Sequence, residues 1–282
     1  MEKIGHDKVK EGGIIHSLYE RIFDYYEKAD KYVSLSSAYS DVLRTAFHAK
    51  EDELIKAGYP RNSLFYSSSW LKTNRDNLVA YLNKTAGIKV SDHTKIILYM
   101  PTFRDNPSQM KSLEQLEDDS AFLRWMVDKD IIIIQKAHFV SQQRNEFKSY
   151  RDTNRILTLN DLLPYEALGA ADILITDYSS CFFDYLILDR PIIHFIYDYG
   201  NYKTADRGVY YDKEDVVCGD APIDFDGLKE SIIKNVDLPS ADSALRKKMR
   251  RRYIEYESSD ACSIIYETLY GIAESKFGQV QK

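Results

Sequence analysis

The sequence predicts an α/β fold that contains a doubly wound parallel sheet, and two observations predict it. Five short apolar runs, each bounded by polar or turn residues, follow one another between residues 92 and 240. Helical patterns lie between them, notably over 118–129, 162–171 and 180–189. Apolar runs that alternate with helices are typical of a parallel sheet that is covered on both faces.

The first 91 residues alternate helix and short strand. Residues 14–30 place apolar side chains at helical spacing, and "KYVSLSS" then predicts a short strand that leads into a loop. A helix is expected over 38–48. Gly58 and Pro60 indicate a turn, after which "WLKTNRDNLVAYLNKTAGI" predicts a long amphipathic helix.

The remaining elements follow from the same patterns. The tail predicts two terminal helices, the first of which has a basic face, "LRKKMRRRY". The five runs expected to form strands are, in order, "KIILYMPTF", "DIIIIQKAH", "RILTLN", "DILITD" and "RPIIHFI".

Composition indicates an ordinary globular protein. The 282 residues are 44% hydrophobic, which is ample for a buried core, and the formal net charge is −6. No basic block indicates sequence-independent binding of nucleic acid, so no nucleic-acid partner is expected. The three cysteines have no paired spacing, which favours a reducing cytoplasm. No run is apolar enough for a signal peptide or a membrane span, so we expect any membrane contact to be peripheral.

Several common catalytic classes are excluded by missing motifs. The sequence contains no G-x-x-x-x-G-K-[ST], G-x-G-x-x-G, G-x-S-x-G or H-E-x-x-H. This argues against a P-loop NTPase, a typical dinucleotide dehydrogenase, an α/β-hydrolase and a zincin metalloprotease. Asp, Glu and His residues do not cluster as metal ligands, so no metal and no cofactor is expected.

The loop after "ILITD" is the first candidate site. In an open parallel sheet, ligands bind beyond the carboxyl ends of the strands. The next helix begins at Ser179-Ser180, where free backbone N–H groups, the positive end of the helix dipole and two hydroxyls could hold phosphate oxygens. The alternative is simple N-capping by Asp177, Ser179 or Ser180.

Other candidate residues follow the neighbouring strands. Lys136 and His138 leave the end of the second run, where the histidine could donate a proton or pair with phosphate, or could be merely structural. Arg104 follows the first run and could bind phosphate, or could pair with the adjacent aspartate. Arg207 and Gly208 could bring a cation and a close backbone to a ligand, or could form a turn.

Five blocks, in this order, carry a resemblance to a known family: "AGYPRNSLF", "ILYMPTFRD", "IIIIQKAH", "DILITDYSSCFFDYLILDRPIIHF" and "RGVYYD". Together they resemble the CDP-glycerol glycerophosphotransferases, which include teichoic-acid primases and polymerases and related capsule-polymer synthases. The T-D-Y-S-S block and the D-R-P-I-I that follows it form the strongest match. The resemblance covers about residues 5–275.

The resemblance implies a GT-B-like fold. We then expect a partial, acceptor-side Rossmann-like domain over 1–91 and a CDP-donor-binding Rossmann-like domain over 92–240. Terminal helices over 241–282 are expected to pack back toward the N-terminal part.

The resemblance also implies transfer of a polyol phosphate from CDP-glycerol or a related CDP-polyol to a polymer or lipid-linked acceptor, with CMP leaving. Ser179, Ser180, Asp177, Lys136 and Gly208 would line the donor site. Arg104 and Arg207 would neutralise the diphosphate. His138 would be catalytic, stabilising the leaving CMP phosphate or donating a proton to it. Arg61 matches the arginine of the G-x-P-R-x-D motif, although Ser63 replaces its aspartate.

The front of the chain departs from the family pattern. The Trp-His-Gly-x-Pro stretch, whose histidine is the family's plausible general base, would fall before Met1. We therefore expect an incomplete first half-domain with an unpaired sheet edge, which could pair with a missing N-terminal half. The enzyme is expected at the cytoplasmic face of the bacterial membrane. Two alternatives remain: a GT-B glycosyltransferase that uses a nucleotide sugar, and a non-catalytic remnant that binds a nucleotide or a partner.

Overall fold

The computed structural model describes residues 3–8, 29–85, 89–102, 111–136, 155–159, 161–202, 209–256 and 259–278. The chain divides into two compact units. The first unit is Ser68–Lys247 with Met1–Glu2, and the second is Lys3–Ser67 with Lys248–Lys282. The helix predicted over 14–30 lies mostly outside the described residues.

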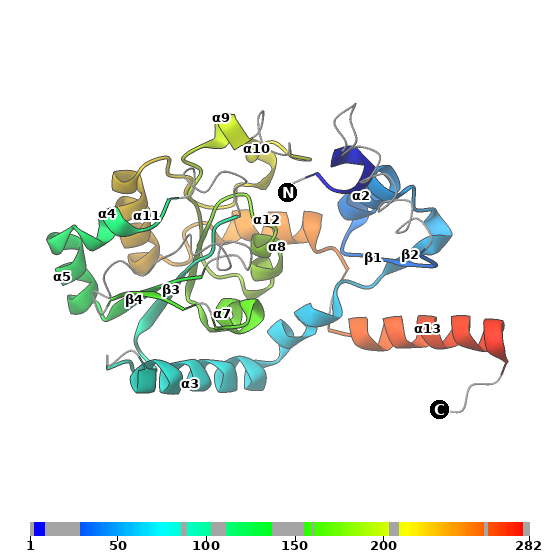
Figure 1. Ribbon diagram of the computed structural model, residues 1–282, viewed down its shortest axis with the longest axis horizontal. Helices are drawn as coiled ribbons and strands as arrows, with labels where there is room; N and C mark the ends of the chain where they lie inside the picture. Colours follow the sequence, from blue (N-terminus) through cyan, green and yellow to red (C-terminus); the bar gives the residue numbers. More distant parts are fainter. Residues whose placement is uncertain are drawn as a thin grey trace. The chain divides into compact units, whose positions relative to one another are not determined.

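A five-stranded parallel sheet forms the centre of the first unit (Figure 1). The strands lie in the order β5-β4-β3-β6-β7, and in register Ile97 of β3 pairs with Ile133 of β4 and Ile173 of β6. Each of the five predicted apolar runs supplies one strand, which confirms the expected sheet. The strands are β3 (Lys95–Tyr99), β4 (Ile131–Gln135), β5 (Ile156–Thr158), β6 (Ile173–Thr176) and β7 (Ile192–His194).

Helices connect the strands and cover both faces of this sheet. The 3-10 helix η5 continues α8 directly. The helical elements of the first unit are α3 (Ser68–Thr85), α4 (Glu114–Glu117), α5 (Ser120–Asp128), α7 (Pro164–Ala170), α8 (Cys181–Tyr185), η5 (Leu186–Leu188), α9 (Tyr199–Asn201), α10 (Lys213–Val216) and α11 (Phe225–Asp237), and α12 (Ser243–Tyr253) begins in it.

The core follows from the period of two in the strands. Ile97, Ile133 and Ile175 point to one face, where they pack in one cluster with side chains of α4, α5 and α11. Strand residues of the other parity, such as Leu98, point to the opposite face, the side of α7 and α8. The isoleucine and leucine side chains of β3, β4 and β6 are at most 2% exposed, because both faces of the sheet are covered.

The helix α3 belongs to the first unit although it precedes residue 92. It packs on α7, where a Cβ added to Gly169 would lie 2.7 Å from the Trp70 ring. Asn74 donates a hydrogen bond to the carbonyl of Glu166 at 2.8 Å. This close approach of two helices requires the glycine, since any side chain would meet the indole.

Arginines join the segments at the amino edge of the sheet. Arg75 donates to the carbonyls of Ala170 and Thr94 and to Asp172, the last at 3.1 Å. Arg190, which precedes β7, donates to the carbonyls of Gly169 at 2.9 Å and Ala171 at 2.6 Å. These bonds satisfy backbone acceptors at the ends of helices and strands, which would otherwise be costly to bury.

The D-R-P block also anchors the start of α12. Asp189 has a left-handed backbone with φ 49°, and its carboxylate accepts a hydrogen bond from Ser243 at 2.8 Å. Arg246 is 2% exposed and donates to the carboxylate of Asp189 at 3.2 Å and to the carbonyl of Pro239 at 3.1 Å. The first arginine of the basic helix is therefore a buried structural residue.

The second unit contains a two-stranded parallel sheet. Val33 of β1 pairs with Ile55 of β2, and a small core joins these strands to Ala261 and Ile265. Its elements are η1 (Gly5–Lys8), β1 (Tyr32–Ser34), α2 (Ser37–Phe47), η2 (Glu51–Glu53), β2 (Leu54–Lys56), η3 (Pro60–Tyr66) and α13 (Ala261–Phe277), together with the end of α12.

Local sequence sets the bounds of α2. Ser36 is its N-cap, and the Ser36 hydroxyl accepts a hydrogen bond from the N–H of Tyr39 at 3.1 Å. The helix ends at His48, whose φ of 51° is left-handed. Among the described residues, no helix has the length and apolar character needed to cross a membrane.

Candidate functional site

The order of the strands creates a topological switch point between β3 and β6. The chain winds toward β5 on one side of β3 and toward β7 on the other, so the loops after β3 and β6 diverge at their carboxyl ends. Two bonds hold these ends together: Met100 N–H donates to the carbonyl of Ile175 at 2.9 Å, and the Thr176 hydroxyl donates to the carbonyl of Met100 at 2.7 Å. A fixed crevice edge results.

Asp177 links the two loops through its carboxylate. It is 3% exposed, and its Oδ1 accepts hydrogen bonds from the Thr102 N–H at 2.8 Å and the Thr102 hydroxyl at 2.6 Å. The same oxygen accepts from the N–H of Tyr178 at 2.6 Å. This oxygen therefore does not cap the helix α8. It joins the loop after β6 to the loop after β3.

Ser179 and Ser180 lie at the start of α8. Ser180 is the exposed N-cap residue and makes no side-chain capping bond, while Ser179 is half-buried and its hydroxyl accepts from the N–H of Cys181 at 3.4 Å. Among the described residues, the only capping bond of this pair is the long one that the Ser179 hydroxyl accepts. N-capping therefore explains the presence of Ser179 weakly and that of Ser180 not at all.

Lys136 lies at the carboxyl end of β4, next to β3. Its N–H donates to the carbonyl of Tyr99 at 2.9 Å, and the residue is 5% exposed. Burial lowers the pKa of the Lys136 ammonium from its ordinary value, while the charge of Asp161 acts in the opposite direction. The sheet order therefore places Lys136 and Asp177 on the two strands that flank β3.

His194 and Thr102 are the residues at this edge that sequence reasoning missed. His194 ends β7, where it pairs in register with Thr176 of β6, and is 1% exposed. Its Nε2 faces the N–H of Cys218 at 3.4 Å and can accept from it. Burial lowers the pKa of His194 to about 4, so the ring is neutral near pH 7. No motif signalled it, since "RPIIHFI" predicted only an apolar strand.

A small pocket opens beside the ends of β6 and β7. Its volume is about 20 Å³, enough for water rather than for a nucleotide. Lys213 stands over the ring of Tyr199 at 5.4 Å, and the ring of Tyr178 stacks on that of Tyr202 at 4.0 Å. The lining residues are Asp177, Tyr178, Phe182, His194, Ile196, Tyr199, Val209, Tyr211, Lys213, Val216 and Val217.

Four predicted site residues lie outside the described residues: Arg104, His138, Arg207 and Gly208. The structure therefore brings together Lys136, Asp177, Ser179 and Ser180 at one edge. Within the second unit, Arg61 is exposed and its guanidinium lies 4.2 Å from the centroid of the Tyr59 ring. Among the described residues, no group of three or more His, Cys, Asp or Glu side chains could hold a metal ion.

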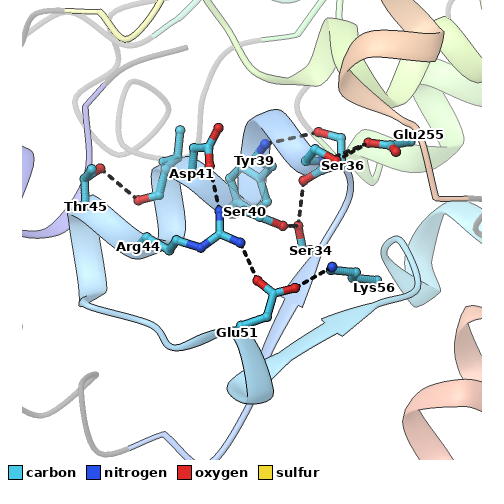
Figure 2. A network of polar contacts seen from close by, with 12 residues as sticks. Ser34, Ser36, Tyr39, Ser40, Asp41, Arg44, Thr45, Glu51, Lys56 and Glu255 are labelled. Atoms are coloured by element: carbon cyan, nitrogen blue, oxygen red, sulfur yellow. Dashed lines mark hydrogen bonds and ion pairs between the residues drawn. The ribbon is translucent and has the colours of Figure 1, made fainter.

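The second unit has its own polar cluster where β1 leads into α2 (Figure 2). The Ser34 hydroxyl lies 2.8 Å from that of Ser40, and the carboxylate of Glu255 accepts from the N–H of Ser37 at 2.8 Å and its hydroxyl at 2.7 Å. The hydrogen bond that the Ser37 N–H donates is the main cause that lowers the pKa of Glu255. Glu255 thus supplies the negative charge at the N-terminus of α2.

A parallel sheet in this strand order places the chain in the class of doubly wound α/β proteins, whose ligands bind beyond the carboxyl ends of the strands at the switch point. The profile of the CDP-glycerol:poly(glycerophosphate) glycerophosphotransferase family matches residues 1–271, and the chain belongs to that family. This confirms the resemblance carried by the five sequence blocks.

Curated relatives agree with this assignment. The teichoic acid poly(glycerol phosphate) polymerase of Bacillus spizizenii is 32% identical over 223 residues, covering 77% of this chain and 53% of the relative. The teichoic acid glycerol-phosphate transferase of Staphylococcus aureus is 26% identical over 284 residues, covering 96% of this chain and 68% of the relative. The chain thus spans about half the length of the first of them.

Solved structures show the same fold. The wall teichoic acid polymerase TagF matches with a TM-score of 0.80 at 23% identity, covering 98% of this chain and 67% of TagF. A TagF variant soaked with CDPG matches with a TM-score of 0.80 at 25% identity, covering 98% of this chain and 66% of that one. The chain therefore has the expected GT-B-like α/β fold.

Proposed function

We propose that this chain transfers glycerol phosphate, or another polyol phosphate, from a CDP-linked donor to a teichoic-acid or capsule-polymer acceptor. The observation that carries the proposal is the match of the glycerophosphotransferase family over residues 1–271. The relatives named above are polymerases and transferases of teichoic acid. A TagF variant soaked with CDPG shares the fold at 25% identity, which supports a CDP-linked donor.

The reaction is a phosphoryl transfer. The acceptor hydroxyl oxygen bonds to the phosphorus that carries the polyol, and the bond from that phosphorus to the bridging oxygen breaks with its electron pair going to CMP. The hydroxyl proton passes to a base on the acceptor side. Such transfers are accelerated mainly by positioning and by neutralising charge on the phosphate oxygens.

We assign the donor diphosphate to the carboxyl edge of the five-stranded sheet. Ser179 and Ser180 would bind phosphate oxygens through hydroxyls and backbone N–H groups, and Lys136, Arg104 and Arg207 would supply positive charge. Gly208 would let the backbone approach the ligand. His138 would stabilise the leaving CMP or protonate it. Arg61 is assigned to the acceptor side on its motif alone.

The first experiment measures CMP release by the purified chain supplied with CDP-glycerol and a lipid-linked acceptor. His138→Ala is expected to reduce turnover by roughly 10²-fold or more, the usual contribution of a general acid, while the affinity for CDP-glycerol stays within about threefold. His93→Ala is the matched control, since His93 is exposed. Turnover that His138→Ala leaves unchanged would refute the role of His138.

Donor specificity separates the two enzymatic candidates. Calorimetric titration with CDP-glycerol and CDP-ribitol, set against UDP- and GDP-sugars, is expected to show binding of a CDP-polyol alone. Tight binding of a nucleotide sugar with none of a CDP-polyol would favour a GT-B glycosyltransferase.

A non-catalytic role that binds a nucleotide or a partner is the second candidate. Exposed apolar side chains on α13, including Tyr266 at 53% and Leu269 at 55%, are a surface on which a partner could pack. Binding of CDP-glycerol without release of CMP, whatever the acceptor, would support this role over the transferase.

Membrane association is assigned to the exposed cations of α12. Arg251 and Arg252 are exposed, whereas Arg250 is half-buried with its guanidinium 5.7 Å from the ring of Tyr66. Replacing both exposed arginines with Gln is expected to weaken binding to phosphatidylglycerol vesicles by roughly thirtyfold, because each cation near an anionic surface contributes about 1 kcal/mol. Replacing the exposed Arg124 of α5 and the exposed Lys129, the C-cap residue of α5, with Gln removes the same charge and is the control.

A further inference from the structure

The carboxyl edge of the sheet carries polar contacts at the ends of three strands. Thr102, after β3, donates twice to Asp177, after β6, at 2.8 and 2.6 Å. His194 ends β7, the strand beside β6, and its Nε2 lies 3.4 Å from the N–H of Cys218. Asp177 and His194 are 3% and 1% exposed. Thr102 and Asp177 thus join the loops after β3 and β6.

The pair of Thr102 and Asp177 acts on the turn that precedes Ser179 and Ser180. Asp177 Oδ1 also accepts from the N–H of Tyr178 at 2.6 Å, so one oxygen fixes the β3 loop and the first amide of the β6 loop at once. Among the described residues, the other two hydrogen bonds to this oxygen both come from Thr102, one from its N–H and one from its hydroxyl. A displacement of about 1 Å in a binding loop is enough to move its groups out of the geometry that binding and reaction require.

We infer that Thr102 and Asp177 form a clamp that positions the Ser179-Ser180 loop for the donor diphosphate. The inference rests on the function proposed above. Thr102 and Asp177 are positioning residues in this assignment, and the phosphate oxygens contact the serines instead. A carboxylate that faced a diphosphate would repel it. The Oδ1 of Asp177 instead accepts hydrogen bonds from Thr102 and Tyr178, which stabilise its negative charge within the protein.

The same kind of pair occurs at the other end of β3 and offers a matched control. Thr94, which precedes β3, donates from its hydroxyl to Asp130 at 2.8 Å and is 1% exposed. Thr94→Val and Thr102→Val each remove one threonine–aspartate hydrogen bond in the same unit. They differ in the edge of the sheet that they affect, because Thr94 lies at the amino edge.

Two readouts test the clamp: amide hydrogen exchange over residues 178–181 in the ligand-free full chain, and the Kd for CDP-glycerol. We expect Thr102→Val to raise exchange over 178–181 and to weaken CDP-glycerol binding by roughly tenfold, in line with a lost hydrogen bond to a charged group. Thr102→Ser, which keeps the hydroxyl, should stay within about twofold of wild type. Thr94→Val should lower Tm at least as much, since the Thr94 hydroxyl also accepts from the N–H of Ser91 at 2.9 Å, and should alter neither readout.

A double-mutant cycle adds a check on the partner. Asp177→Asn and Thr102→Val should weaken binding non-additively, because both act on one pair of side chains. A merely structural role would lower Tm while leaving the Kd measured well below Tm unchanged.

The outcomes separate the two proposals. If wild type binds CDP-glycerol and Thr102→Val binds it equally well, the clamp is wrong and the proposed function stands. If wild type does not bind CDP-glycerol, the proposed donor fails, and the exchange result alone decides whether Thr102 orders the loop. Unchanged exchange over 178–181 in Thr102→Val overturns the clamp in either case.

Discussion

Arg246 donates from Nε to Oδ1 of Asp189 at 3.2 Å, and the side chains are 2% and 31% exposed. The pair joins the end of η5 to α12. Because the guanidinium is buried, its positive charge is stabilised by the carboxylate of Asp189 and by the carbonyls of Asp189 and Pro239. These carbonyls accept hydrogen bonds from its Nη2 at 3.2 and 3.1 Å.

Neutralising Asp189 should therefore destabilise the protein. We expect Asp189→Asn, which tolerates the left-handed backbone, to lower the free energy of unfolding by about 1–3 kcal/mol, since it leaves a buried cation without its counter-charge. Urea denaturation measures this. Lys247→Ala is the control: its ammonium also lies near Asp189, at 3.4 Å, but is 59% exposed, so a loss within about 0.5 kcal/mol is expected. Equal losses would contradict the buried role of Arg246.

Gly169 is a second position where stability should respond sharply. Gly169→Ala places a Cβ 2.7 Å from the Trp70 ring, so α3 and α7 must separate, at an expected cost of about 1–3 kcal/mol. Nothing lies within 4 Å of a Cβ at Gly200, so Gly200→Ala should be close to neutral. Thermal unfolding of both variants checks this, and a Gly169→Ala protein as stable as wild type would show that the helices do not meet there.

Glu255 gives a pH dependence whose sign is fixed. Its pKa is lowered in the folded state, mainly by the hydrogen bond from the Ser37 N–H. Its contribution to stability is therefore present above the ordinary glutamate pKa of about 4.3 and is lost as pH falls through the lower folded value. Glu255→Gln should destabilise the protein at pH 7 and make less difference in acid. A difference from wild type that stays constant between neutral and acid pH would argue against the charge as its cause.

The cysteines should differ in reactivity. Cys262 is exposed, while Cys181 and Cys218 are buried and burial raises the pKa of each thiol to about 12. Since the thiolate is the reactive form, a disulfide reagent at pH 8 should label Cys262 quickly and the other two only on unfolding. Cys262→Ser should abolish the fast phase. Fast labelling of Cys218 in the folded chain would show that the contact between His194 and Cys218 opens.

The strands of the large sheet were predictable because each is a run of β-branched or leucine side chains between polar residues. The isoleucines of β4 leave no other interpretation at that length. In contrast, the sequence around Gly58 and Pro60 indicates only a turn and does not predict β2 or η3. β2 has three residues, and its pairing with β1 depends on chain about 20 residues away, which a local pattern does not contain.

Part of the candidate site was also predictable. The rule that ligands bind at the carboxyl ends of strands predicts from the sequence that Lys136, Asp177 and the serine pair lie at one edge of the sheet. The role of Asp177 was not predictable, because its partner Thr102 is 75 residues away in the chain. His194 was missed for the same reason. Hydrogen bonds between loops of different strands leave no periodic trace in the sequence.

The amino edge and the carboxyl edge of the large sheet have different roles. Where the strands start, Arg75 and Arg190 tie helix ends and neighbouring chain together. Where they finish, the loops hold the groups assigned to chemistry. Substitutions meant to stabilise the protein can therefore be sought at the amino edge, which is distant in the fold from the residues proposed to bind the donor.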